Sequence, residues 1–270
     1  LGFLKGLYPD DAGRIPTHVF NSNTHDWLLR GYTLCPNLNA AVEKFVTSKI
    51  VTDKGRQVDS AGGLARAASI TKEDPHLPSA FNVFDWFLLS RSGYAGTVRL
   101  PPISDDDFTQ VASAANWIET QKYAASDIAG QYIAGALLNR FVNESEKMLS
   151  GNAAQQYPPA RRMIEYSGHY PILLGVLAAL QLDGANFGSQ EGVKTTIPSW
   201  AAALIWELHT GGEVRLFWRQ GIDSPIEPIP CDSKGSYSCS IASLKSRLLA
   251  SGAPASKGDF CSLCGSSSTV

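Results

Sequence analysis

The stretch 166–180, YSGHYPILLGVLAAL, places a single histidine between two apolar runs. Residues 162–167 (RMIEYS) have the length of a buried strand, and 171–182 begin with a proline, which the first turn of a helix tolerates. His169 therefore stands at the carboxyl end of a predicted strand, where open α/β sheets hold ligand-binding and catalytic groups. The alternative is a core histidine whose hydrogen bonds are satisfied internally.

Composition narrows the class of protein. The chain has 270 residues, of which 44% are hydrophobic and 18% are charged, and its formal net charge is −2. These values are typical of a globular protein that is long enough for one large α/β domain or for a domain carrying an insertion. The charge gives no reason to expect a nucleic-acid partner, and no run of about 18 apolar residues predicts a transmembrane helix.

Two long amphipathic helices are expected before the histidine segment. The first covers 104–122, where Ser104 can cap the first turn and three aspartates follow at the positive end of the helix dipole. The second covers 125–149, because apolar residues recur there at helical spacing.

The region between 36 and 100 is interrupted by residues that break long elements. Within it, 81–89 (FNVFDWFLL) is interpreted as a buried helix whose aromatic side chains pack in a core. The interrupting residues are Gly62, Gly63, Pro75 and Pro78.

A β-hairpin is predicted near the C-terminal end. Residues 200–209 and 213–220 flank the turn sequence Thr-Gly-Gly at 210–212. The second strand alternates apolar and polar positions, with one face formed by Val214, Leu216 and Trp218.

The cysteines have two interpretations. They lie at positions 35, 231, 239, 261 and 264. Cys261 and Cys264 form a CxxC motif, but a zinc site needs a second pair or histidines at ligand spacing, so no metal is expected. Disulfides that hold a loop-rich tail fit better and imply an oxidising compartment. The sequon Asn-Glu-Ser makes Asn143 a candidate for glycosylation.

A series of short motifs, in order along nearly the whole chain, resembles the histidine acid phosphatases. No single motif is specific, and the resemblance rests on their order and spacing. The motifs are 6–9 (GLYP), 15–19 (IPTHV), 26–29 (DWLL), 35–36 (CP), 82–85 (NVFD), 99–102 (RLPP), 166–169 (YSGH), 206–208 (WEL) and 214–219 (VRLFWR).

The resemblance implies an α/β fold, namely a three-layer α/β/α core like that of phosphoglycerate mutase with a mainly helical insertion. The core would comprise 1–35 and 123–270, the insertion 36–122, and a disulfide-tied tail 231–270. The N-terminal part of the family's core, including central strands, has no counterpart in this sequence. We therefore expect that residues 1–270 do not fold alone, because unpaired strand edges and apolar faces would be exposed.

The resemblance also implies a disulfide pattern. Cys35 is expected to pair with Cys261 or Cys264, and Cys231 with Cys239, which leaves one thiol over.

In this family an Arg-His-Gly histidine attacks phosphorus and forms a phosphohistidine, while arginines and a second histidine clamp the phosphoryl oxygens. His169 matches the clamping histidine. The next residue in the family is an aspartate that gives a proton to the leaving alcohol, whereas this chain has Tyr170, a phenol with an ordinary pKa of about 10. No Arg-His-Gly occurs in the sequence, so none of the other histidines fits the nucleophile: His18, His25, His76 and His209.

Two functions follow as hypotheses. The first is phosphomonoester hydrolysis, impaired or absent here because the nucleophile motif is missing and Tyr170 replaces the acid. The second is a pseudophosphatase that serves as a structural or binding subunit of a secreted or membrane-associated assembly. The expected ligand is a phosphomonoester or phosphate, and the expected protein partners are a homo-oligomer or a host complex. No cofactor is implied, and the expected location is secreted, in the lysosomal or endomembrane lumen, or at the cell surface.

Overall fold

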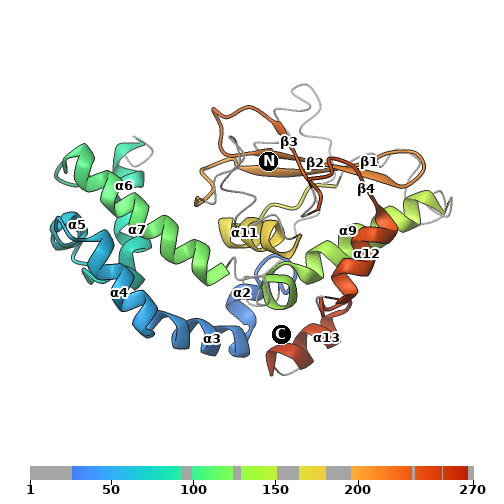
Figure 1. Cartoon of the computed structure of the whole chain (residues 1–270), viewed down its shortest axis with the longest axis horizontal. Coiled ribbons are helices and arrows are strands. Elements are labelled where there is room, and N and C mark those ends of the chain that lie inside the picture. The colour runs from blue at the N-terminus through green and yellow to red at the C-terminus, as the bar shows by residue number, and fades with distance from the viewer. Residues whose placement is uncertain are drawn as a thin grey trace, which may run out of the picture.

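The computed structural model describes residues 26–92, 99–123, 129–150, 164–180, 196–232, 235–250 and 252–266. In these residues helices combine with a small antiparallel sheet, as in an α/β protein. The helices α3 to α7 form one part of the molecule, and the sheet with its covering helices forms the other (Figure 1). The family motifs at 6–9 and 15–19 lie outside the described residues.

The helical part follows the breaks that the sequence contains. Its elements are α3 Pro36–Val46, α4 Lys49–Val58, α5 Gly63–Thr71, the 3-10 turn η1 Leu77–Ser79, α6 Ala80–Arg91 and α7 Asp105–Tyr123, and the short helix α2 Gly31–Leu34 precedes them. Gly62, with a φ of 73°, adopts the left-handed conformation that separates α4 from α5. The helix expected at 81–89 is confirmed as α6, but it is buried only in part, because Val83 and Phe87 are buried whereas Trp86 is 38% exposed.

The helix expected at 104–122 is confirmed as α7. The Asp107 amide donates to the Ser104 hydroxyl oxygen over 3.1 Å, which caps the first turn as expected. Val111, Ala115 and Ile118 are buried in a hydrophobic cluster whose buried members all come from the helical part, and Ile197 packs against it from outside that part. A second, separate cluster lies under the sheet, although the predicted domain boundaries themselves stay a prediction.

The single helix expected at 125–149 is wrong at 129–133, where its described residues begin. A π-helical turn, η2, covers Ala129–Ile133, and the regular helix α9 is Gly135–Leu149. The physical reason is a close approach to α11, Tyr170–Ala179. A Cβ at Gly175 would lie 2.4 Å from the Ile133 side chain, so the π-helical turn is pressed against a helix that has no side chain at that point.

The predicted hairpin is confirmed. Strands β1 (Ala203–Leu208) and β2 (Glu213–Arg219) pair antiparallel, and Gly211 and Gly212 have the positive φ angles of 88° and 83° that the turn requires. Strands β3 (Glu227–Ile229) and β4 (Cys239–Ser240) both pair with β2. Along β2 the predicted inward face is buried, since Val214, Leu216 and Trp218 are each at most 2% exposed.

Helices cover one face of this sheet. The covering elements are α9, α11 and α12 (Ile241–Ala250) (Figure 1). They contribute to the cluster under the sheet the side chains of Leu137, Leu138, Val142, Ile172, Val176, Leu177, Ile241, Leu244 and Leu248. Among the described elements no helix lies on the opposite face, so the three-layer arrangement is not confirmed.

The strand expected at 162–167 is not a strand where the structure describes it. Residues 164–169 belong to no regular element, although the backbone is extended at His169, with φ −116° and ψ 163°. A strand needs a neighbour that accepts and donates its backbone hydrogen bonds, and no described strand pairs with this segment. The side chain of Tyr166 instead contacts Phe141 of α9, with ring centroids 5.3 Å apart.

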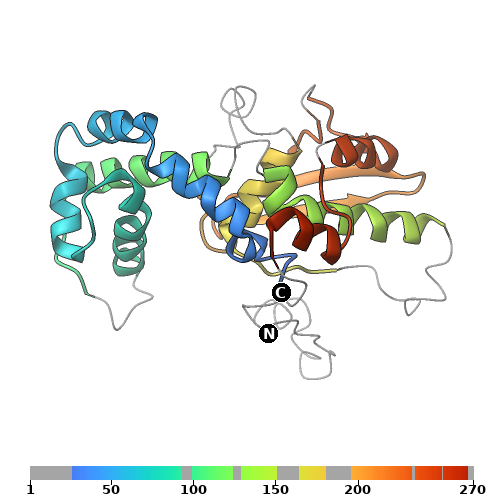
Figure 2. The ribbon, with the colours of Figure 1, turned by 90° about the horizontal axis from the view of Figure 1, so that it is seen from below.

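Two disulfides connect the tail to the body and close a local loop. Cys35 pairs with Cys264 over a Cα–Cα distance of 4.7 Å, and Cys231 pairs with Cys239. Of the two partners that the resemblance offers for Cys35, the structure therefore selects Cys264, and Cys261 is a buried free thiol. The tail helix α13, Lys257–Cys264, lies beside the start of α3 (Figure 2).

Removing the long-range disulfide should cost more stability than removing the local one. The two bridges join residues 229 and 8 positions apart, so chain entropy predicts stabilisation of about 5 and about 2.5 kcal/mol, respectively. We expect the double substitution of Cys35 and Cys264 by Ser to lower the free energy of unfolding by about twice as much as that of Cys231 and Cys239. Urea denaturation of both variants measures this ratio, and equal losses would contradict the chain-entropy argument.

Candidate functional site

His169 lies at the N-terminal boundary of α11 and is exposed to solvent. Its backbone oxygen accepts a hydrogen bond from the Ile172 amide over 3.1 Å, which fixes the start of the helix. Its ring makes no hydrogen bond or ion pair with another described residue. The interpretation as a satisfied core histidine is therefore wrong, and the imidazole faces solvent.

Tyr170 points into the protein, unlike its neighbour. Its hydroxyl donates a hydrogen bond to Glu119 Oε2 over 2.5 Å, and Lys122 Nζ lies 2.7 Å from Glu119 Oε1. Glu119 is only 2% exposed, so both oxygens of a buried carboxylate have a partner. The contact joins α7 to α11, because Glu119 and Lys122 come from one helix and Tyr170 from the other.

Aromatic rings enclose this polar contact. The Tyr170 ring lies 4.9 Å from Phe81 and 6.3 Å from Tyr123, whose ring is in turn 6.0 Å from Tyr32, as measured between centroids. Burial, followed by the negative charge and hydrogen bond of Glu119, raises the pKa of Tyr170 far above its ordinary value. Burial and the charge of Glu119 likewise raise the pKa of Tyr123.

The segment before α2 adds a cation near the same cluster. The Arg30 guanidinium hydrogen-bonds the Tyr32 hydroxyl and opposes the rise that burial causes in the pKa of Tyr32. A Cβ at Gly168 would lie 3.7 Å from the Leu29 side chain, so the chain around Arg30 runs close to the residue that precedes His169. The described residues thus bring a guanidinium and an exposed imidazole to neighbouring segments.

Tyr170, which the resemblance places at the proton-donor position, has its hydroxyl directed toward Glu119 in the interior. Its role at that position stays a prediction. Glu119 itself was missed in the sequence. Its spacing could have predicted its burial, because Glu119 follows Ala115 by four residues and so lies on the buried face of α7. A buried charge at this position requires a partner.

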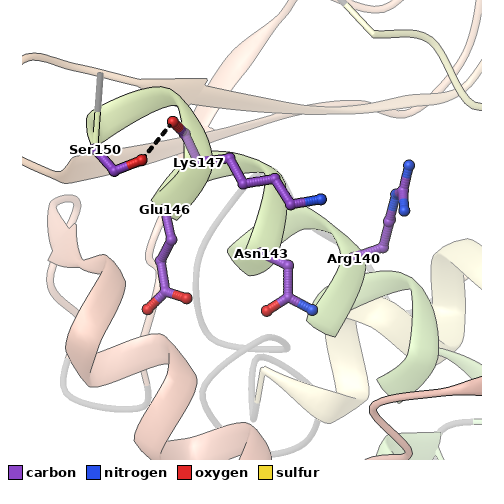
Figure 3. Close-up of a pocket in the computed structure, with 5 residues that line it drawn as sticks. All are labelled: Arg140, Asn143, Glu146, Lys147 and Ser150. Atoms are coloured by element: carbon purple, nitrogen blue, oxygen red, sulfur yellow. Dashed lines mark hydrogen bonds between the residues drawn. The ribbon is translucent and has the colours of Figure 1, made fainter. Parts of the chain in front are cut away.

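A separate surface pocket lies along α9. Figure 3 shows its lining, which consists of Arg140, Asn143, Glu146, Lys147 and Ser150. Both oxygens of Glu146 accept from Lys245 over 2.8 Å, and Arg140 and Lys147 lie 3.0 and 3.5 Å from Glu144. Because these charges are paired within the protein, the pocket has no evident ligand group, and it contains neither His169 nor Tyr170.

The glycosylation candidate Asn143 belongs to this pocket. Its sequon lies in the middle of α9, and Glu144 and Ser145 are each 4% exposed. Sequons that carry glycans typically lie in surface loops, so this helical and largely buried setting disfavours a glycan on the folded chain.

Two further properties bear on the class of protein. Among the described residues, no group of three or more histidine, cysteine, aspartate or glutamate side chains is placed to hold a metal ion. No helix in the described part of the chain has the length and hydropathy needed to cross a membrane. The two disulfides are compatible with a secreted or lumenal protein.

No protein-family model matches the chain, and no curated protein matches it.

Substituting Tyr170 by Phe should destabilise the fold at neutral pH. The change removes a hydrogen bond to a buried carboxylate, for which we expect a loss of about 1.5–3 kcal/mol in the free energy of unfolding. Tyr123→Phe is the matched control, because its hydroxyl makes no hydrogen bond with a described residue, and we expect a change within about 0.5 kcal/mol. Urea denaturation compares the two variants, and equal effects would show that the Glu119 contact contributes nothing.

Alkaline pH should destabilise the protein through Tyr170. Its pKa is higher in the folded than in the unfolded chain, so the unfolded chain loses the proton first and stability falls as the pH rises above about 10. While the folded phenol stays protonated, this group contributes a slope of about 1.4 kcal/mol per pH unit. Stability measured by denaturation between about pH 8 and 11.5 should fall less steeply in Tyr170→Phe than in the unaltered chain, and identical slopes would contradict the assignment.

Proposed function

We propose that this protein is a histidine-acid-phosphatase-like pseudophosphatase, in which the fold serves as a binding or structural unit and phosphomonoester hydrolysis is absent or strongly impaired. The family assignment rests on the ordered motifs in the sequence. The loss of activity is inferred from position 170, which is independent of where the sequence begins.

The observation that carries the proposal is the hydrogen bond from the Tyr170 hydroxyl to Glu119. Cleavage of an alkyl phosphate needs an acid near the leaving oxygen, because an alkoxide is a poor leaving group. The one proton of Tyr170 is already donated to a buried carboxylate, and the pKa of this phenol is raised. Tyr170 is thus unsuited to replace the aspartate that the resemblance implies.

Glu119 does not take over the role of acid. Its two carboxylate oxygens already have partners, because one accepts from the Tyr170 hydroxyl and the other pairs with Lys122. Its 2% exposure also keeps it from a substrate.

His169 supports retention of a ligand-binding surface. It is exposed, and the chain that carries Arg30 passes close to Gly168. Imidazolium and guanidinium groups both donate to phosphate oxygens, so phosphate or a phosphomonoester is the ligand class for this surface. The proposal includes the three-layer, phosphoglycerate-mutase-like core that the resemblance implies. It also includes a secreted or lumenal location, which the two disulfides support.

The test is an assay of the mature protein with p-nitrophenyl phosphate, an activated aryl phosphate, and with an unactivated alkyl phosphate at acid pH. We expect the alkyl phosphate to be hydrolysed no faster than by the His169→Ala variant. The aryl phosphate is the more permissive probe, because its leaving group does not need an acid, so its turnover tests the rest of the phosphate site independently of position 170.

Turnover of the alkyl ester that disappears in His169→Ala would overturn the proposal and support an active acid phosphatase, whereas such turnover of the aryl ester alone would indicate an enzyme impaired at the acid. A phosphate-dependent rise in melting temperature that is lost in His169→Ala, without turnover, would support the pseudophosphatase.

Tyr170→Asp alone is a poor variant for restoring activity, because it would place a second carboxylate beside Glu119. It should therefore be combined with Glu119→Gln.

A further inference from the structure

Three cysteines meet where the tail helix joins the helical part. Cys35 directly precedes α3 and is bonded to Cys264, the last residue of α13. Cys261 lies in the same helix, three residues before Cys264, and keeps a free thiol. All three are at most 5% exposed and belong to one hydrophobic cluster.

We propose that Cys261 is the attacking thiol of an internal thiol–disulfide exchange that converts the Cys35–Cys264 bridge into a Cys261–Cys264 bridge. The Cys261 thiolate attacks the sulfur of Cys264, the Cys261–Cys264 bond forms, and the Cys35–Cys264 bond breaks. Cys35 leaves as a thiolate and takes up the proton that Cys261 released. The exchange is an isomerisation, so it needs no external oxidant or reductant, and it does not depend on the phosphatase resemblance.

The spacing of the two tail cysteines permits the new bond. Residues three apart on a helix are neighbours on one face, with Cα atoms about 5 Å apart, and disulfides span Cα distances of about 4.4–6.8 Å. Their Cβ atoms must approach by about 1–2 Å from ordinary helical spacing.

The end of α13 can accommodate this approach. Gly265 follows the helix with a left-handed φ of 65°, and its amide donates to both the Cys261 oxygen and the Ser262 oxygen, the latter over 3.3 Å. The two cysteines therefore occupy a last turn that combines an α-helical contact with one of the tighter 3-10 type.

The place of Cys35 makes it a suitable leaving group. It is the N-cap residue of the 11-residue helix α3, and its side chain makes no capping hydrogen bond. A thiolate at a helix N-terminus is stabilised by the dipole and by the free amides of the first turn, and a more stable thiolate leaves faster.

The exchange would change how the tail is held. A bridge across 229 residues would be replaced by one that closes a single helical turn, and the start of α3 would no longer be covalently attached to α13. The contact from Asn37 Nδ2 to the Leu263 oxygen, at 2.7 Å, would then be a noncovalent tie between them. The freed Cys35 thiol is the chemical signature of the exchanged form.

The experiment follows the location of the free thiol. The mature protein is incubated without reductant at several values between about pH 6 and 9, then quenched in acidic guanidinium with excess N-ethylmaleimide and digested with trypsin. Cleavage after Arg30 and Lys44 separates the Cys35 peptide from the tail peptide. We expect maleimide on Cys35 in a measurable fraction of molecules, and a rate of appearance that increases several-fold over this pH range because the thiolate is the attacking species.

Two variants control for scrambling during the quench. Cys261→Ser should show no label on Cys35. The double variant Cys261→Ser with Ser262→Cys moves the thiol to position 262, which is exposed and faces a different side of the helix from Cys264. This variant should also show no label on Cys35. Label on Cys35 in either variant would overturn the proposal. So would label confined to Cys261 in the unaltered protein at every pH, and this result does not require either variant to fold.

Discussion

The buried carboxylate of Glu119 is the interaction on which the arrangement of the two parts depends. A charge at 2% exposure is tolerated only when it is paired, and here the pairing uses one lysine from its own helix and one tyrosine from another. The same helix, α7, supplies Val111, Ala115 and Ile118 to the core of the helical part. Its last turn therefore joins that core to α11, which covers the sheet.

This constraint explains why adjacent residues have different chemistry. His169 has the extended backbone of a helix N-cap and is exposed, whereas Tyr170 is the first residue of α11 and is directed toward α7. A hydroxyl that donates its only proton to Glu119 is not available to a leaving group. Structural use and catalytic use of position 170 are therefore alternatives, and the packing between α7 and α11 favours the structural one.

The long-range disulfide adds a covalent tie between the helical part and the tail. Cys35 lies between α2 and α3, near the Arg30 and Tyr32 that approach the aromatic cluster, and its partner Cys264 ends the chain's last described helix. The helical part is thus held to α11 by a buried ion pair with its hydrogen bond and to the tail by a covalent bridge. Both connect segments that are far apart in the sequence, which is how a short sheet and a helical part become one structure.

Local patterns in the sequence were sufficient for the elements that depend on neighbouring residues. Ser104 predicted the start of α7, Gly211 and Gly212 predicted the hairpin turn, and the alternation along β2 predicted its buried face, because capping, positive φ and strand periodicity act over a few residues. The break at Ala129–Ile133, the missing strand at 164–169 and the choice of Cys264 over Cys261 were decided by tertiary contacts. The partner of Tyr170 lies 51 positions earlier in the chain, so no local pattern specified it. The sequence by itself determined the start of α7, the hairpin turn and which histidine stands before α11. Only the packing of α7 against α11 decided that the next side chain serves the interior, because burying the charge of Glu119 requires a donor there.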